Sequence, residues 1–204
     1  MNKIDQAILS SNTKQEKYPK FIAQGDVHGQ LEQLVDNLAT IGLSDSQANW
    51  YGNDAIFLQI GDMIDRGPQS IEAWNYICTL QKNAAMHHGQ VVRLLGNHEL
   101  LVLQNKFNHT NFANPEGFRE RVKQDILSAK LQASYVFMDH IFIHGCLRND
   151  MRKILVREIA AQKQVYSRTI KMTDIATYMN QLLVQAVTDD DYHHPIFRES
   201  FSRG

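Results

Sequence analysis

Four short apolar runs in this chain end at a glycine that lies beside a polar side chain able to bind a metal ion. The segments that close them read GDVHG, GDMIDRG, GNHE and HGC, at residues 25–29, 61–67, 96–99 and 144–146. A short apolar run stopped by glycine is typical of a buried strand, and glycine permits a sharp turn directly after it. This repeated ending constrains the possible folds more than any other feature of the sequence.

Segments with helical periodicity lie between the apolar runs. Residues 30–41 and 70–80 carry apolar side chains at the spacing of one helix face, and Gly42 stands where the first of these helices would end. The predicted strands are residues 21–24, 54–60, 91–95 and 135–144. Strands that alternate with helices in this way predict an α/β layered fold.

The pattern changes after residue 147, where two further helices are predicted at about 150–170 and 173–187, with Thr173 or Asp174 as the N-cap of the second. No repeat or low-complexity tract divides the chain. We expect an N-terminal arm (1–19), a core (20–148), a helical cap or insertion (149–192) and a short segment leading to further structure (193–204).

Composition excludes several classes of protein. The 204 residues are 43% hydrophobic, which suits one globular domain, and a formal net charge of -1 gives no general attraction to nucleic acid. No window is apolar enough for a membrane span, and the N-terminus lacks the apolar core of a secretory signal. The two cysteines do not form a disulfide framework. We therefore expect a cytoplasmic protein with no nucleic-acid partner and no membrane span.

The polar residues at the strand ends predict a metal site. Ligands of open α/β sheets bind beyond the carboxyl ends of the strands, so distant residues can meet there. The candidates are Asp26, His28, Asp62, Asn97 and His144. Carboxylate, imidazole and amide donors without a thiolate favour Mn, Fe or Zn, and the central Asp62 could bridge two ions. Paired ions suit in-line displacement at a phosphoester.

The motifs GDVHGQ, GDMIDRGPQS, LLGNHE and FIHGC resemble, in order and spacing, those of the phosphoprotein phosphatase branch of the calcineurin-like metallophosphoesterases. The resemblance covers about residues 21–147. It implies a β-sandwich flanked by helices, in four layers, with a two-metal centre at the strand ends. It also implies a C-terminal helical cap and a phosphorylated protein or peptide as substrate.

The resemblance also implies roles for individual residues. The first ion is assigned to Asp26, His28 and Asp62 and the second to Asp62, Asn97 and His144, with Mn as the expected metal and Fe or Zn as alternatives. His98 would protonate the leaving oxygen, and Asp65 would orient and charge-stabilise that imidazole. Arg66 would grip the phosphoryl oxygens together with Asn97. Glu99 is interpreted as a structural hydrogen-bonding residue.

Two residues differ from the pattern that is usual in the protein serine/threonine phosphatases of animals, and both point to one branch of this family. Leu95 precedes Gly96 where arginine is usual, and Cys146 stands where a second glycine is usual. Both resemble the bacterial and Shewanella-like branch, some of whose members prefer phosphotyrosine.

A further metal-binding histidine and a second phosphate-binding arginine are usual after the cap, and no matching stretch occurs before Gly204. The ending HHPIFRESFSRG resembles the lead-in to that region, so we expect a truncated chain. The candidates for the missing groups are His193 or His194 and Arg198 or Arg203.

Three functions are consistent with these residues. The leading one is a metal-dependent phosphoprotein phosphatase that hydrolyses phosphoserine and phosphothreonine, or phosphotyrosine, by attack of a hydroxide bridging the two metals. A diadenosine-polyphosphate hydrolase is an alternative, although DRG and GNHE argue against it. A catalytically incomplete module that binds phosphoproteins is the other.

Overall fold

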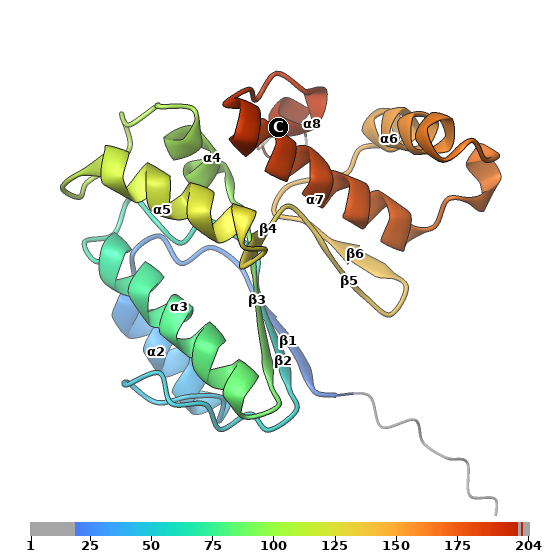
Figure 1. Cartoon of the computed structure of the whole chain (residues 1–204). Coiled ribbons are helices and arrows are strands. Elements are labelled where there is room, and N and C mark those ends of the chain that lie inside the picture. The colour runs from blue at the N-terminus through green and yellow to red at the C-terminus, as the bar shows by residue number, and fades with distance from the viewer. Residues whose placement is uncertain (1–18, 200, 202–204) are drawn as a thin grey trace, which may run out of the picture.

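The computed structural model describes residues 19–199 and 201, and its strands and helices alternate as the sequence predicts (Figure 1). The predicted N-terminal arm lies almost wholly outside the described residues. The strands are β1 (Phe21–Gln24), β2 (Ile56–Gln59), β3 (Gln90–Leu94), β4 (Leu131–Gln132), β5 (Tyr135–Phe137) and β6 (His140–Phe142). The helices are α2 (Leu31–Thr40), α3 (Ser70–Met86), α4 (Asn97–Leu103), α5 (Pro115–Leu127), α6 (Asn149–Lys163), the 3-10 helix η1 (Ser167–Thr169), α7 (Met172–Asp189) and α8 (Pro195–Glu199).

The first four strands form a parallel sheet in the order β1-β2-β3-β4. The register pairs Phe21 with Ile56, and Leu58 with Val92. All four residues of β2 are buried, because both faces of a parallel sheet are covered by other elements. Since the strands run in one direction, the loops that follow β1, β2 and β3 leave the sheet at the same edge.

Helices and a β-hairpin cover the two faces of this sheet (Figure 1). Helices α2 and α3 pack on one face through buried side chains such as Leu38 and Ile77. The antiparallel hairpin of β5 and β6 covers the other face, where the ring of Phe137 stacks on Phe21 at a centroid distance of 4.3 Å. Helix α7 contacts the hairpin from outside. The predicted layered α/β fold is therefore confirmed.

The hairpin corrects one predicted strand. Residues 135–144 are two antiparallel strands, with Tyr135 opposite Phe142, and the turn between them places Met138 at φ 53°. An apolar run can conceal a two-residue turn because apolar side chains on both arms face the same sheet. The fourth strand of the parallel sheet is instead β4, whose two residues are too few to show a periodic pattern.

The C-terminal helices lie close to their predicted positions. Helix α6 ends at Lys163, earlier than predicted, because Gln164 takes a left-handed conformation at φ 55°. The N-cap of α7 is Lys171, not Thr173 or Asp174, and the carboxylate of Asp174 accepts a hydrogen bond from the backbone N–H of Lys171 at 2.8 Å. The division of the chain at residues 149 and 193 stays a prediction. Across the described part of the chain, the helices are too short or too polar to cross a membrane.

Candidate metal and catalytic site

The five predicted metal ligands meet at one place. Asp26 and His28 follow β1, Asp62 follows β2, Asn97 begins α4 after β3, and His144 follows β6. Single ligand atoms of Asp26, Asp62 and His144 lie within 4.8 Å of one another. A second group of the same size joins His28 and His98 to Asp62. Asp62 belongs to both groups. These groups divide the residues differently from the prediction, which assigns Asp26 and His28 to one ion and His144 to the other and makes His98 a proton donor.

His28 presents a lone pair to two carboxylates. Its Nδ1–H donates to the carbonyl oxygen of Ile64 at 3.0 Å, which fixes the tautomer. Burial lowers the pKa of His28, so the ring is neutral near pH 7. Its buried Nε2 atom has no hydrogen-bond partner and lies 3.4 Å from an oxygen of Asp26 and 3.6 Å from one of Asp62. An unprotonated nitrogen beside two carboxylates is satisfied by a cation between them.

His144 repeats this arrangement from the second sheet. Its Nδ1–H donates to the carbonyl oxygen of Ile60 at 2.6 Å, and its Nε2 lies 2.9 Å from Oδ1 of Asn97 and 3.4 Å from Oδ2 of Asp62. Burial alone would lower the pKa of His144, but the adjacent carboxylate of Asp62 outweighs it and raises that pKa. The same negative field that attracts a proton there attracts a metal ion.

The donor set fits divalent cations. It consists of two buried or half-buried imidazoles, two carboxylates and one amide oxygen, without cysteine. Both imidazoles donate their other nitrogen to a backbone carbonyl, which is the usual way a ligating histidine is oriented. The ligand types do not distinguish Mn from Fe or Zn.

His98 and Asp65 form a separate buried pair beside these ligands. The Nδ1–H of His98 donates to Oδ2 of Asp65 at 2.7 Å, and the two side chains are 7% and 2% exposed. This hydrogen bond raises the pKa of His98 above its ordinary value. Because Asp65 binds Nδ1, the Nε2 atom of His98 is left for other interactions in the site. The His98 ring lies edge-on to that of His28 at a centroid distance of 4.8 Å.

Glu99 holds the loops in register, which agrees with the structural role predicted for it. Its fully buried carboxylate accepts backbone hydrogen bonds from Asp62 at 3.0 Å, Met63 at 2.9 Å and Gly96 at 2.9 Å. Burial, reinforced by the charge of Asp62, raises the pKa of Glu99 to about 7. One side chain therefore fixes the segments that follow β2 and β3 relative to each other.

The loops approach too closely for a side chain at Gly96. A Cβ there would lie 2.1 Å from the backbone nitrogen of Asp62, whereas real contacts essentially never fall below 3.0 Å. Several non-glycine site residues also adopt positive φ, which is sterically unfavourable for them. They are His28 (49°), Asp62 (54°), Asp65 (68°) and Arg66 (64°).

The remaining candidates lie at the margin of the cluster or outside it. Arg66 is exposed, and its positive charge is one of the smaller causes, after burial, that lower the pKa of His28. His193 is an exposed side chain bonded to Asp191, and His194 lies 3.4 Å from Glu158, so neither joins the ligand groups.

The two candidate arginines differ in what the structure describes of them. Arg198 lines a cavity that Asn97 also lines. Arg203 lies outside the described residues.

One residue near the site was missed by sequence reasoning. The ring of His109 lies 5.9 Å from that of His98, edge to face. It belongs to the loop between α4 and α5, in the sequence KFNHTNF, where no motif marks it. Only its position in the fold relates it to the site.

Comparison with known proteins yields consistent matches. The sequence profile of the family described as calcineurin-like phosphoesterase matches residues 19–183. Shewanella-like protein phosphatase 1 of Plasmodium berghei is 34% identical over 159 residues, which are 69% of this chain and 42% of that protein. Shewanella-like protein phosphatase 2 of Arabidopsis thaliana is 30% identical over 107 residues, or 52% of this chain and 27% of that protein. The chain thus spans less than half the length of these relatives.

A solved structure shares the fold. The cold-active protein-tyrosine phosphatase of a psychrophilic Shewanella species superimposes with a TM-score of 0.58 at 20% identity. The match covers 91% of this chain and 62% of that one.

Proposed function

The chain belongs to the calcineurin-like phosphoesterase family, and from this premise we propose that it is a metal-dependent phosphoprotein phosphatase. The substrate is a phosphoserine, phosphothreonine or phosphotyrosine monoester in a protein or peptide. The likeness to Shewanella-like protein phosphatases supports the phosphoprotein as substrate class. The observation that carries the proposal is the pair of imidazole Nε2 atoms that both face the carboxylate of Asp62.

Asp26, His28, Asp62, Asn97 and His144 are the residues that would hold two divalent ions. Such ions, when bound, lower the pKa of the attacking water and neutralise the charge of the phosphoryl oxygens. The protein supplies the positions of the donors, because Ile60 and Ile64 fix both imidazoles through their carbonyl oxygens. Glu99 fixes the backbone of Asp62.

His98 supplies the proton for the leaving oxygen. Its pKa is raised by the hydrogen bond to Asp65, which favours the protonated ring that a proton donor requires. Nδ1–H stays bonded to Asp65, and the proton on Nε2 is the one available for transfer. After transfer the neutral ring keeps the Nδ1–H tautomer, so the imidazole does not need to turn. Arg66 contributes positive charge for the phosphoryl group at the exposed side of the site.

The test is phosphate release with added Mn²⁺, first from p-nitrophenyl phosphate and then from peptides carrying each phosphorylated residue. We expect Asp62→Asn to abolish release, because this carboxylate belongs to both ligand groups. His88→Asn is the matched control, since His88 is exposed at the end of α3 and should leave the rate unchanged.

Two results would contradict the proposal. Release of nucleotides from diadenosine tetraphosphate without hydrolysis of any monoester would favour the diadenosine-polyphosphate hydrolase. No hydrolysis of any substrate, with retained binding of phosphopeptides, would favour the binding module.

A further inference from the structure

Basic residues gather on α6 and on the turn that follows it. Residues 148–168 contain six basic residues and two acidic ones, a net charge of +4, whereas the whole chain carries -1. The rest of the chain is therefore acidic, and this segment forms a local surface of positive potential. The six basic residues are all exposed, and they are Arg148, Arg152, Lys153, Arg157, Lys163 and Arg168.

Three of these residues form a basic face on α6, which consists of Arg152, Lys153 and Arg157. Among residues 19–199 and 201, none of the three takes part in an ion pair. Lys153 and Arg157 stand one helical turn apart, a spacing at which like charges repel each other and destabilise the helix. The two acidic residues of the segment are paired elsewhere, Asp150 with Arg148 at 3.3 Å and Glu158 with His194 at 3.4 Å. An anionic partner would relieve the repulsion on this face.

An exposed aromatic side chain lies at the end of the basic face. Tyr166 is 76% exposed and Val165 is 44% exposed, which are large fractions for such side chains. The N–H of Val165 donates to the carbonyl oxygen of Ala160 at 3.0 Å, so the turn folds back on the end of α6. Ala160 follows Lys153 by two helical turns on the same side of the helix. The guanidinium of Arg168 lies over the Tyr166 ring, 5.3 Å from its centroid, so positive charge and aromatic surface adjoin each other.

This combination matches the chemistry of an anionic lipid surface. Lysine and arginine are attracted to anionic headgroups, and tyrosine is enriched where the headgroups meet water. A lipid interface also accepts an aliphatic side chain such as Val165 without a matched pocket, whereas the phosphates of a nucleic acid would leave it in water. The apolar side chains of α6 face the core, where Met151, Leu155 and Ile159 are buried. The helix would therefore lie on a membrane surface through its basic face and would not insert its apolar face.

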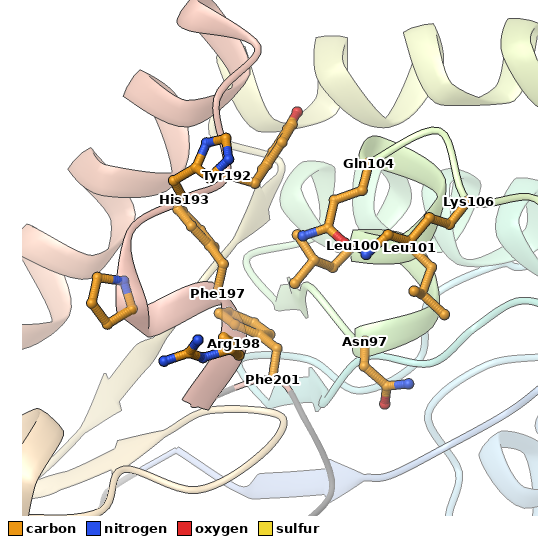
Figure 2. A pocket seen from close by; sticks show the side chains of 11 residues that line it. Asn97, Leu100, Leu101, Gln104, Lys106, Tyr192, His193, Phe197, Arg198 and Phe201 are labelled. Atoms are coloured by element: carbon orange, nitrogen blue, oxygen red, sulfur yellow. Dashed lines mark hydrogen bonds between the residues drawn. The ribbon is translucent and has the colours of Figure 1, made fainter.

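We propose that α6 and the turn after it form a surface that attaches the protein to anionic membranes. The basic face contacts the lipid phosphates, and Tyr166 and Val165 enter the headgroup layer. Figure 1 shows α6 at the periphery of the molecule. The cavity beside the candidate active site is lined instead by residues of α4, Lys106 and the chain from Tyr192 to Phe201 (Figure 2). No residue of α6 lines that cavity, so attachment through α6 leaves it open to substrate.

Flotation with lipid vesicles tests the attachment. Phosphatidylcholine vesicles that contain about 30% phosphatidylserine should bind the protein, and vesicles of phosphatidylcholine alone should not. The basic face is neutralised in the triple variant Arg152→Gln/Lys153→Gln/Arg157→Gln. Its partition coefficient should fall on the order of a hundredfold, because each basic residue near an anionic surface contributes roughly fivefold. A matched control removes the same charge from exposed lysines outside α6, in Lys20→Gln/Lys82→Gln/Lys130→Gln, and should bind nearly as the wild type does.

A second variant reports whether the turn enters the headgroup layer. Tyr166→Trp adds an exposed indole, whereas Trp50 and Trp74 are 5% and 1% exposed and should not respond to lipid. We expect the emission of this variant to shift to shorter wavelength with phosphatidylserine vesicles and to stay unchanged with phosphatidylcholine vesicles.

Several results would overturn the proposal. Equal binding to both kinds of vesicle would show that the charge of the lipid does not matter. Wild-type binding by the triple variant, with unchanged circular dichroism, would exclude the basic face, and an unshifted emission of bound Tyr166→Trp would exclude the turn. Absence of vesicle binding, with binding of single-stranded RNA or polyglutamate that the triple variant loses, would assign the surface to another class of partner. None of these measurements depends on phosphate release, so their outcome is independent of the proposed function.

Discussion

The Asp65–His98 pair makes the sharpest prediction about the chemistry. Asp65→Asn keeps an oxygen that can accept the Nδ1–H of His98 but removes the negative charge, now 2.7 Å from the imidazole nitrogen. A hydrogen bond between charged groups contributes about 1.5–3 kcal/mol, and one pKa unit equals about 1.36 kcal/mol. We therefore expect the pKa of His98 to fall in the variant, because the charge that favours the protonated ring is removed. In the native protein the hydrogen bond to Asp65 is the largest cause that raises the pKa of His98 above 6.5, and the substitution should reverse that increase.

Activity and stability should both report the change. The general acid must be protonated, so the alkaline limb of the kcat/KM profile should move to lower pH, in step with the pKa of His98. A folded-state pKa above 6.5 also means that protonated His98 stabilises the fold below pH 6.5, and that this contribution is lost as the pH rises through the raised pKa. Asp65→Asn should therefore narrow the difference in unfolding free energy between pH 6 and pH 9.

The measurement is an NMR titration of the histidine ring protons together with the pH–rate profile. Asp191→Asn is the matched control, because Asp191 pairs with His193, whose side chain is 96% exposed. That change should move neither the profile nor the His98 resonance. An unmoved alkaline limb in Asp65→Asn, with an intact fold, would refute the assignment of His98 as the proton donor.

Three more predictions follow from the cluster. Glu99→Ala leaves three buried N–H groups without an acceptor, at a cost of about 1–3 kcal/mol each. Denaturant unfolding should therefore show that the free energy of unfolding falls by at least about 3 kcal/mol. A decrease below about 1 kcal/mol would contradict the structural role of this side chain. Mn²⁺ affinity, measured by calorimetry, should fall as the pH is lowered through the raised pKa of His144, because the proton and the ion compete for Nε2. An Mn²⁺ affinity that does not change between about pH 6 and 8 would exclude His144 as a ligand. Gly96→Ala should abolish Mn²⁺ binding or folding, since its Cβ meets the backbone of Asp62, and wild-type behaviour on both measurements would show that the loops can separate.

The sequence predicts the first three parallel strands and the helices α2 and α3 between them, because those segments carry long or sharply bounded apolar patterns. The sequence analysis predicts no helix or strand between residues 97 and 127, yet α4 and α5 lie there. The signal for α5 was present: the side chain of Asn114 accepts the N–H of Gly117, and Pro115 begins the helix. The hairpin of β5 and β6 was not separable from a single strand, because its turn interrupts an apolar run by only Met138 and Asp139.

The motifs indicate which residues form the candidate site, but they do not predict the backbone conformation that orients the side chains. The positive φ angles at His28 and Asp62 cost on the order of 1–3 kcal/mol each and have no signature in sequence periodicity. Contacts between distant loops compensate for them. The carbonyl oxygen of Asp62 accepts the N–H groups of Val27 and His28, both at 2.9 Å, and Glu99 receives the N–H of Asp62 itself. The loop after β1 is therefore hydrogen-bonded to the loop after β2, which is in turn hydrogen-bonded to Glu99 of α4. These hydrogen bonds between loops fix the positions of the metal-binding side chains. For this reason Glu99→Ala should weaken metal binding even though the ligands themselves are unchanged.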